Sequence, residues 1–99
     1  MVLLLVAYDV NTQTKEGESR LRKVAKTCEA YGMRVQNSLF ECDVDPKQRY
    51  ELEFKLKKII EETEDSLLIY DLGNNYTRRI QVHGHNPKYF NVKDDLIDI

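Results

Sequence analysis

The sequence predicts an α+β fold in which two helices cover one face of an antiparallel sheet. Two observations lead to this fold class. The runs 2–8 and 66–72 are apolar enough to be strands, and the segments 18–31 and 46–63 carry apolar residues at helical spacing. A chain of 99 residues has room for one domain built around one core. The elements below are taken in chain order.

The first strand is apolar without interruption from Val2 to Tyr8 and then meets a single carboxylate, Asp9. A strand exposed on one face alternates apolar and polar residues, so an unbroken run indicates a strand that is covered on both faces. The carboxylate oxygens of Asp9 are hard ligands, which suit Mg²⁺ or Mn²⁺ better than softer metals. One carboxylate does not make a metal site, and other ligands would have to complete it.

The polar segment 11–17 reads as a loop, and a helix is predicted from Glu18 to Tyr31, followed by Gly32 as a stop. On this helix Arg20 and Lys23 flank the apolar stripe, whereas Arg22 and Lys26 face away from it. Such a basic cluster is typical either of a solvated helix face or of a surface that binds phosphates.

The segment 34–44 is rich in strand-forming residues, but Asn37 and Ser38 interrupt it, which predicts a bulge or a break into two short strands. Asp45 and Pro46 then form a helix start, with aspartate as the N-cap and proline at the first helical position. This second helix is predicted to reach about Thr63. Asp43 and Asp45 are explained by a turn and by this cap.

After the strand 66–72, the turn Gly73-Asn74-Asn75 reverses the chain, and 79–83 is a candidate short returning strand. The order β-α-β-β-α-β is that of the ferredoxin-like fold. We therefore predict a ferredoxin-like domain over 1–83 and a C-terminal tail over 84–99. The tail has too few apolar residues to build a core alone.

The two-sided apolarity of the first strand predicts a dimer. In this fold both helices lie on one face of the sheet, so a second copy of the chain is the simplest cover for the other face. A twofold interface pairs like with like and would bring Asp9 near its symmetry mate. Two carboxylates with water ligands around one divalent cation form a plausible hard-metal site.

Composition excludes several classes of protein. The net charge of −2 argues against a protein that coats nucleic acid by bulk electrostatics. No segment is apolar over the length that a membrane helix needs, and no signal peptide is expected, so the protein is predicted to be cytoplasmic. Cys28 and Cys42 are expected to be buried and reduced.

The sequence resembles a known family. The segments that carry the resemblance are 8–10 (Tyr-Asp-Val), 20–24 (Arg-Leu-Arg-Lys-Val), 34–41 (Arg-Val-Gln-Asn-Ser-Leu-Phe-Glu) and 66–70 (Ser-Leu-Leu-Ile-Tyr). They are similar to the Cas2 family of small CRISPR-associated proteins, which act with the Cas1 integrase in spacer acquisition. The resemblance covers nearly the whole chain, and 34–41 is its most specific part. Leu39 and Met33 are small departures from the family pattern.

The resemblance implies a ferredoxin-like homodimer that binds Mg²⁺ or Mn²⁺ through Asp9 and whose C-terminal tail, 84–99, docks on a partner subunit. It also implies an enzyme, a metal-dependent endonuclease that acts on double-stranded DNA or RNA, and a scaffold that holds DNA for the integrase. Residues at positions implicated in nucleic-acid contact or activity are Tyr8, Arg20, Arg22, Arg34 and Phe40. From the residues alone, the core is the favoured place for Tyr8 and Phe40, because aromatic residues in strands are more often core than nucleotide contacts.

Four candidate functions remain at this stage. The protein is either a catalyst or a purely structural DNA-binding adaptor, because only Asp9 is well placed for metal chemistry. A related ribonuclease toxin of the virulence-associated D type shares the general fold. A small-molecule-sensing domain would need a ligand pocket that the sequence does not indicate.

Overall fold

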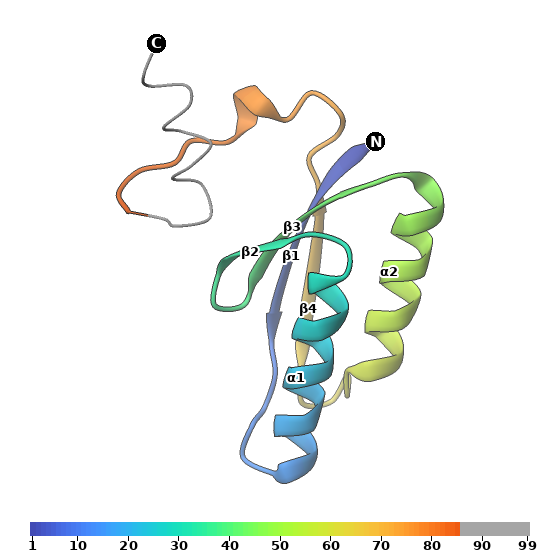
Figure 1. Cartoon of the computed structure of the whole chain (residues 1–99). Coiled ribbons are helices and arrows are strands. Elements are labelled where there is room, and N and C mark those ends of the chain that lie inside the picture. Colours follow the sequence, from blue (N-terminus) through green and yellow to red (C-terminus); the bar gives the residue numbers. More distant parts are fainter. Residues whose placement is uncertain (86–99) are drawn as a thin grey trace.

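The computed structural model describes residues 1–85 (Figure 1). In chain order the strands and helices are β1 (Val2–Asp9), α1 (Lys15–Glu29), β2 (Met33–Gln36), β3 (Leu39–Val44), α2 (Pro46–Ile59) and β4 (Ser66–Asp71), followed by the short 3₁₀ helix η1 (Thr77–Arg79). This is the predicted ferredoxin-like order. The predicted tail, 84–99, lies almost entirely outside the described residues.

The four strands form one antiparallel sheet in the order β2-β3-β1-β4. β1 lies in the interior of the sheet and pairs with β3 from Val2↔Val44 to Ala7↔Leu39. On its other edge β1 pairs with β4, from Leu4↔Asp71 to Asp9↔Ser66. The long apolar strand β1 is therefore an inner strand, as β3 is, with a neighbour on each side.

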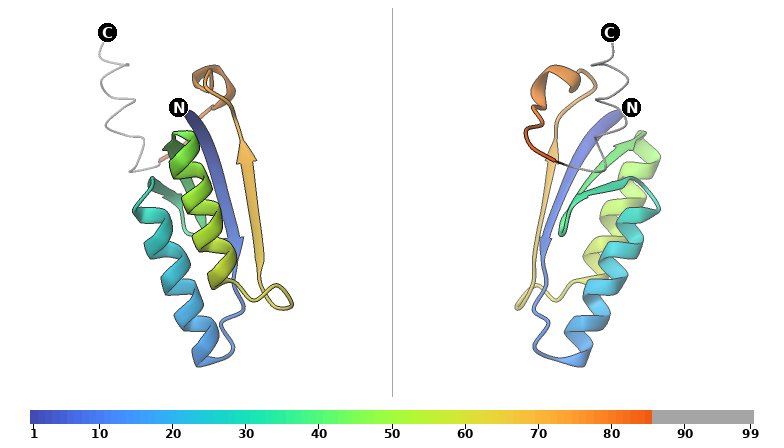
Figure 2. Two further views of the ribbon diagram at one scale, coloured as in Figure 1. Left: turned by 90° about the vertical axis from the view of Figure 1, so that its right-hand side faces the viewer. Right: turned by 60° about the vertical axis from the view of Figure 1, so that its left-hand side comes forward.

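Both helices pack on the same face of the sheet (Figure 2). Alternate residues of β1 point into the layer between sheet and helices, as the period of a strand requires. The buried core contains Leu4, Val6, Tyr8, Val10, Val24, Cys28, Phe40, Cys42, Val44, Leu52 and Leu56. Asp9 follows Tyr8 and therefore lies on the opposite, helix-free face.

The helix-free face of the sheet is mostly apolar and largely uncovered in one chain, with the half-buried Glu41 paired between Leu5 and Met33. Leu68 and Tyr70 of β4 are 50% and 52% exposed, and Met33 of β2 is 40% exposed. Leu5 and Ala7, which pair with Tyr70 and Leu68, are half-buried. Leu3 on this face is buried, and the Tyr76 hydroxyl donates a hydrogen bond to Asp43, the residue paired with Leu3. We call Leu5, Ala7, Met33, Leu68 and Tyr70 the open face.

α1 begins earlier than the apolar pattern predicts. Thr14 is its N-cap, and the Thr14 hydroxyl accepts a hydrogen bond of 3.0 Å from the backbone N–H of Gly17. Residues 15–17, predicted to be loop, are thus the first helical turn. Glycine is required at position 17, since a Cβ there would lie 1.8 Å from the carbonyl oxygen of Asn11. This close contact packs the start of α1 against the chain leaving β1.

The break at Asn37-Ser38 and the start of α2 are confirmed. β2 and β3 are separate strands, with an irregular register between Arg34 and Gln36. Asp45 caps α2 through the backbone N–H of Gln48, and Gln48 returns the hydrogen bond, so the two form a capping box. The prediction that α2 reaches Thr63 is wrong. The helix ends at Ile59, because Ile60 is extended and the N–H of Glu61 donates to Asp65 instead.

The prediction of a strand over 79–83 is also wrong. Residues 77–79 form η1 instead, and the described residues 80–83 pair with no strand. Two alternating apolar residues, Ile80 and Val82, are therefore not enough to specify a strand here. Within residues 1–85, no helix combines the length and the apolar character needed to cross a bilayer.

Cys28 and Cys42 are free and completely buried, as predicted. Burial raises the pKa of the Cys28 thiol to about 12 and that of the Cys42 thiol to about 11. Both thiols therefore remain protonated at neutral pH and act as small apolar side chains of the core.

Candidate nucleic-acid and metal site

Asp9 stands at the carboxyl end of β1, on the edge of the open face. Its Cα is paired with that of Ser66 on β4, whereas the pairing with β3 stops two residues earlier, at Ala7. The Asp9 side chain is exposed. This carboxylate is consequently free of the core and accessible to a ligand at the margin of the apolar surface.

One chain does not supply a complete metal site around Asp9. No group of three or more His, Cys, Asp or Glu side chains within residues 1–85 is arranged to hold a metal ion. The carboxylate oxygens of Asp9 suit Mg²⁺ or Mn²⁺ in kind, but those cations take about six ligands. The donors present in one protomer therefore fit a hard metal only if a second protomer and water supply the rest.

Tyr8, Phe40 and Arg34 form a stack beside Asp9 on the helix side of the sheet. The Tyr8 and Phe40 rings lie 6.2 Å apart between centroids, at an interplanar angle of 24°. The Arg34 guanidinium lies 4.9 Å from the centroid of the Phe40 ring, within cation–π range. The structure thus brings three of the predicted site residues together, with Phe40 fully buried, Tyr8 nearly so and Arg34 half-buried.

Two further contacts hold Arg34 in place. One guanidinium nitrogen donates to the backbone carbonyl of Asn37 in the β2–β3 turn. Another lies 3.5 Å from a carboxylate oxygen of Glu29 at the end of α1. The guanidinium is therefore fixed by the turn, by α1 and by the Phe40 ring while it stays partly exposed.

The Tyr8 hydroxyl is buried and has no hydrogen-bond partner within residues 1–85. Burial raises its pKa, and the nearby positive charge of Arg34 opposes that shift without cancelling it. The hydroxyl therefore stays protonated, one residue away from Asp9 and close to the Arg34 guanidinium. A buried group of this kind is uncommon and often marks a functional position.

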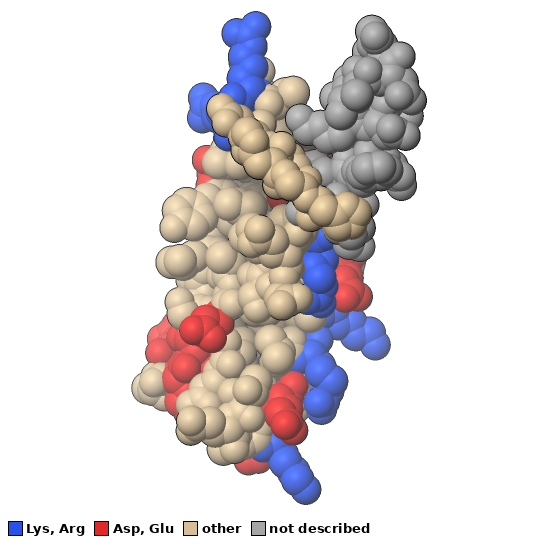
Figure 3. Space-filling view, turned by 90° about the vertical axis from the view of Figure 1, so that its left-hand side faces the viewer, with Lys and Arg blue, Asp and Glu red and all other residues tan. Residues whose placement is uncertain are grey.

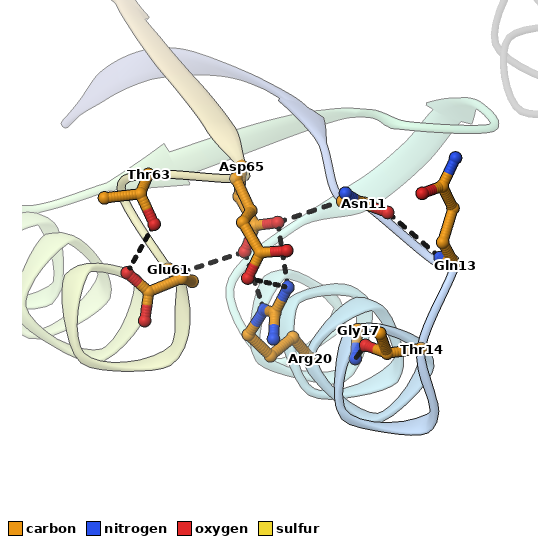
Figure 4. A network of polar contacts seen from close by, with 9 residues as sticks. Asn11, Gln13, Thr14, Gly17, Arg20, Glu61, Thr63 and Asp65 are labelled. Atoms are coloured by element: carbon orange, nitrogen blue, oxygen red, sulfur yellow. Dashed lines mark hydrogen bonds and ion pairs between the residues drawn. The ribbon is translucent and has the colours of Figure 1, made fainter.

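Arg20 lies further along the same end of the molecule, where it binds Asp65 (Figure 4). Its Nε and one terminal nitrogen donate to the two carboxylate oxygens of Asp65 at 2.8 and 3.2 Å. Glu64 is a more distant second partner, at 3.9 Å. Arg22, in contrast, is exposed on α1, together with Lys23 and Lys26.

The comparisons with known proteins decide the family. The model of the family described as "CRISPR associated protein Cas2" matches residues 1–80. The chain belongs to the Cas2 family.

Curated members of the Cas2 family align with nearly all of the chain. The "CRISPR-associated endonuclease Cas2" of Halalkalibacterium halodurans is 49% identical over 96 residues, which cover 97% of this chain and 99% of that protein. The "CRISPR-associated endoribonuclease Cas2" of Chlorobaculum tepidum is 51% identical over 83 residues, covering 84% of this chain and 86% of that protein. The resemblance inferred from the sequence motifs is confirmed.

Solved Cas2 structures share the fold. A crystal structure of Streptococcus pyogenes Cas2 is 50% identical, covers 83% of this chain and 99% of its own, and superposes with a TM-score of 0.72. A chain of a partial Cas6-RT-Cas1–Cas2 complex is 30% identical, covers 89% of this chain and 92% of its own, and gives a TM-score of 0.61. These Cas2 structures support the ferredoxin-like assignment.

Asp65 belongs to this end of the fold, and the sequence motifs did not single it out. Its side chain is fully buried and accepts hydrogen bonds from the backbone N–H of Asn11 at 3.0 Å and of Glu61 at 2.8 Å, in addition to those from Arg20. In the sequence it sits in an acidic run, 61–65, that is typical of a solvated surface. Because Arg20 and Asp65 are 45 residues apart, no local pattern indicates the pair.

The environment of Asp65 predicts that the free energy of unfolding depends on pH. The hydrogen bond from Arg20, followed by those from the Glu61 and Asn11 N–H groups, lowers its pKa in the folded chain. The ionised form therefore stabilises the fold above the unfolded-state pKa of about 3.9, and this contribution is lost as the pH falls below that value.

We expect Asp65→Asn to lower the free energy of unfolding by about 1–3 kcal/mol at pH 7, because an amide NH₂ would face N–H donors. The difference from the wild type should shrink at pH 3, because Asp65 of the unfolded chain is largely protonated there. Urea unfolding curves of both proteins at the two pH values measure this. An equal difference at pH 3 and pH 7 would show that the ionised carboxylate is not the stabilising species.

Proposed function

We propose that this protein is a homodimeric, nucleic-acid-binding component of CRISPR adaptation that acts with the Cas1 integrase and has metal-dependent endonuclease activity. The family assignment supports the general role, and relatives named endonuclease and endoribonuclease support the activity. The complex that contains both Cas1 and Cas2 supports the partner. In this proposal the open face is the dimer interface, and the dimer brings together the residues of the metal site.

A second copy of the chain is the partner that best fits the open face. Figure 3 shows a broad surface on this side of the molecule that is neither acidic nor basic, with charged side chains at its margins. Leaving Leu68 and Tyr70 half-exposed on adjacent positions of one strand face is unfavourable in water, and pairing two such faces removes both from solvent. A twofold interface there would also place two Asp9 carboxylates at one margin.

In this dimer Asp9 and its symmetry mate would hold Mg²⁺ or Mn²⁺. When bound, such an ion polarises a phosphoryl oxygen and lowers the pKa of a coordinated water. The contribution of the chain itself is to hold the Asp9 carboxylate at the sheet margin, exposed and free of competing ion pairs among residues 1–85. The phosphate backbone would be held by positive side chains nearby.

Arg22 and Arg34 are the arginines whose placement suits phosphate contact. Arg22 is exposed on α1, so a phosphate can reach its guanidinium fork directly. Arg34 is partly exposed and is fixed at the β2–β3 turn. Phe40 and Tyr8 lie in the core beneath it, so we propose that they act by supporting Arg34 rather than by touching nucleic acid.

Integration by the protein together with Cas1 on a short duplex tests this proposal. We expect Arg22→Glu and Arg34→Glu each to weaken duplex binding about tenfold or more and to reduce its dependence on salt, because each removes a phosphate contact. Integration should fall in parallel. Lys57→Glu makes the same charge change at an exposed position of α2 and is the matched control. Equal losses for all three variants would indicate only a net-charge effect and would contradict the proposed surface.

A purely structural adaptor is the second candidate function. One observation favours it, namely that Asp9 has no nearby cluster of carboxylates within residues 1–85. In this case the dimer would bind duplex and Cas1 without cleaving nucleic acid.

A further inference from the structure

Arg20 and Arg22 are two residues apart on α1 but lie in different surroundings. The Arg20 side chain is only 16% exposed and faces the fully buried carboxylate of Asp65. Arg22 is exposed, and its side chain has no ion pair within residues 1–85. The two arginines therefore differ in what they are free to bind.

The Asp65 carboxylate is saturated by four hydrogen bonds, two on each oxygen. Oδ1 accepts from the Asn11 N–H at 3.0 Å and from an Arg20 terminal nitrogen at 3.2 Å. Oδ2 accepts from Arg20 Nε and from the Glu61 N–H, both at 2.8 Å. Figure 4 shows Asp65 at the centre of this network, which joins α1, the loop after β1 and the loop before β4. We call it the Asp65 clamp.

The Asp65 clamp holds the chain on two sides of Asp9. Asn11, which Asp65 binds through its backbone, follows Asp9 by two residues. Ser66, which follows Asp65, is the residue paired with Asp9 across β1 and β4. Both the loop that leaves Asp9 and the strand beside it are thus fixed to the same carboxylate.

Binding a phosphate through the fork of Arg20 would compete with the Asp65 clamp, and the Arg20 side chain is only 16% exposed. Its bidentate fork is already used by Asp65, and turning it outward would leave a buried carboxylate without its counter-charge, which is costly. The geometry of the fork matters as well, because a lysine at this position offers a point charge instead of two parallel N–H groups.

We propose that Arg20 and Asp65 are positioning residues, which set the backbone of the Asp9 loop, and that Arg20 does not contact nucleic acid. This inference rests on the proposed function in one respect, that Asp9 is a metal ligand. In the dimer the clamp would hold the two Asp9 carboxylates at the separation that one cation needs. Arg22 then carries the phosphate contact that the family resemblance assigns to both arginines.

The test compares Arg20→Gln and Arg22→Gln, which remove one positive charge each, using three measurements on the full chain. The first is hydrogen exchange of the Asn11 amide by NMR. The second is Mn²⁺ binding followed by electron paramagnetic resonance. The third is the salt dependence of affinity for a short DNA duplex. Arg20→Lys is included because it keeps the charge and one hydrogen bond.

We expect Arg20→Gln to speed exchange of the Asn11 amide at least tenfold and to weaken Mn²⁺ binding at least tenfold, with the salt slope of duplex binding unchanged. Arg22→Gln should lower that slope by about one and leave exchange and Mn²⁺ binding as in the wild type. Arg20→Lys should fall between the wild type and Arg20→Gln in exchange and in Mn²⁺ binding.

Three results would overturn the inference. A salt slope reduced equally by both glutamine variants would make Arg20 a phosphate contact. Faster Asn11 exchange with unchanged Mn²⁺ binding would show that the clamp does not position Asp9. Global unfolding of both Arg20→Gln and Arg20→Lys would make the clamp a determinant of the whole fold instead of one loop.

Asp9→Ala separates this inference from the proposed function. If Asp9→Ala leaves Mn²⁺ binding intact, the proposed metal site is wrong. Asn11 exchange and the salt slope then still test whether Arg20 holds the loop or the DNA.

Discussion

Asp9→Asn is expected to reduce Mg²⁺-dependent cleavage by the dimer at least about 100-fold while leaving duplex binding and integration with Cas1 in place. The reduction follows from the loss of a charged metal ligand, since a bound divalent ion contributes several kcal/mol to a phosphoryl-transfer transition state and each 1.4 kcal/mol changes the rate about tenfold. Binding should persist because the proposed phosphate contacts, Arg22 and Arg34, lie on other elements. Cleavage of labelled DNA and RNA duplexes and single strands, with and without chelator, measures the first effect.

Asp43→Asn is the matched control for this substitution. Asp43 is also an exposed aspartate, on β3 of the same sheet, and asparagine keeps an oxygen that can accept the hydrogen bond from the Tyr76 hydroxyl. We expect its cleavage rate to equal that of the wild type. Cleavage that survives Asp9→Asn would point to a contaminating nuclease or to another site. Integration lost in a folded Asp9→Asn dimer would mean that the metal is needed for assembly on DNA.

The second large effect is expected from Leu68→Lys combined with Tyr70→Lys. If the open face is the dimer interface, each substitution buries a charge without a partner and costs about 2 kcal/mol or more. Together they should raise the dissociation constant of the dimer on the order of 1000-fold. Sedimentation equilibrium over a range of concentrations measures it, and Mg²⁺-dependent cleavage should disappear along with the dimer.

Tyr50→Lys combined with Phe54→Lys is the control for surface aromatics in general. Tyr50 and Phe54 are 70% and 49% exposed on α2, stacked on each other and distant in the fold from the open face. We expect this variant to stay dimeric. If it dissociates while the β4 variant does not, the dimer forms through α2 and Asp9 does not meet its symmetry mate.

The parts of the fold that could be predicted depend on local signals. The N-cap Asp45 followed by Pro46 specifies a helix start within two residues, and the polar pair Asn37-Ser38 breaks a strand by itself. The start of α1 could not be predicted, because its first turn, 15–17, carries no such local signal. This turn is polar and contains a glycine. Only the contact of Gly17 with Asn11 shows why that glycine belongs to a helix.

In the candidate site, too, some residues could be predicted from local signals and others could not. Asp9 could be predicted because the end of an apolar strand is visible in the sequence. The environments of Arg20 and Arg22 could not, since they depend on Asp65, which the fold brings from 45 residues away. Similarly, Phe40 and Arg34 are six residues apart in a segment where either could face solvent, and the register of β2 against β3 decides that Phe40 is buried.

The position of β1 between β3 and β4 has a consequence for how the chain acquires its structure during synthesis. β1 is made first, but its two neighbours are completed only at residues 44 and 71, and the residues paired across β1 and β4 are separated by most of the described chain. Contacts of such long sequence separation form late, because the intervening loop must be closed before they can be made. A nascent chain that ends before β4 thus presents one bare edge of its most apolar strand to the surroundings. Until the last strand leaves the ribosome, that edge is open to pairing with other chains.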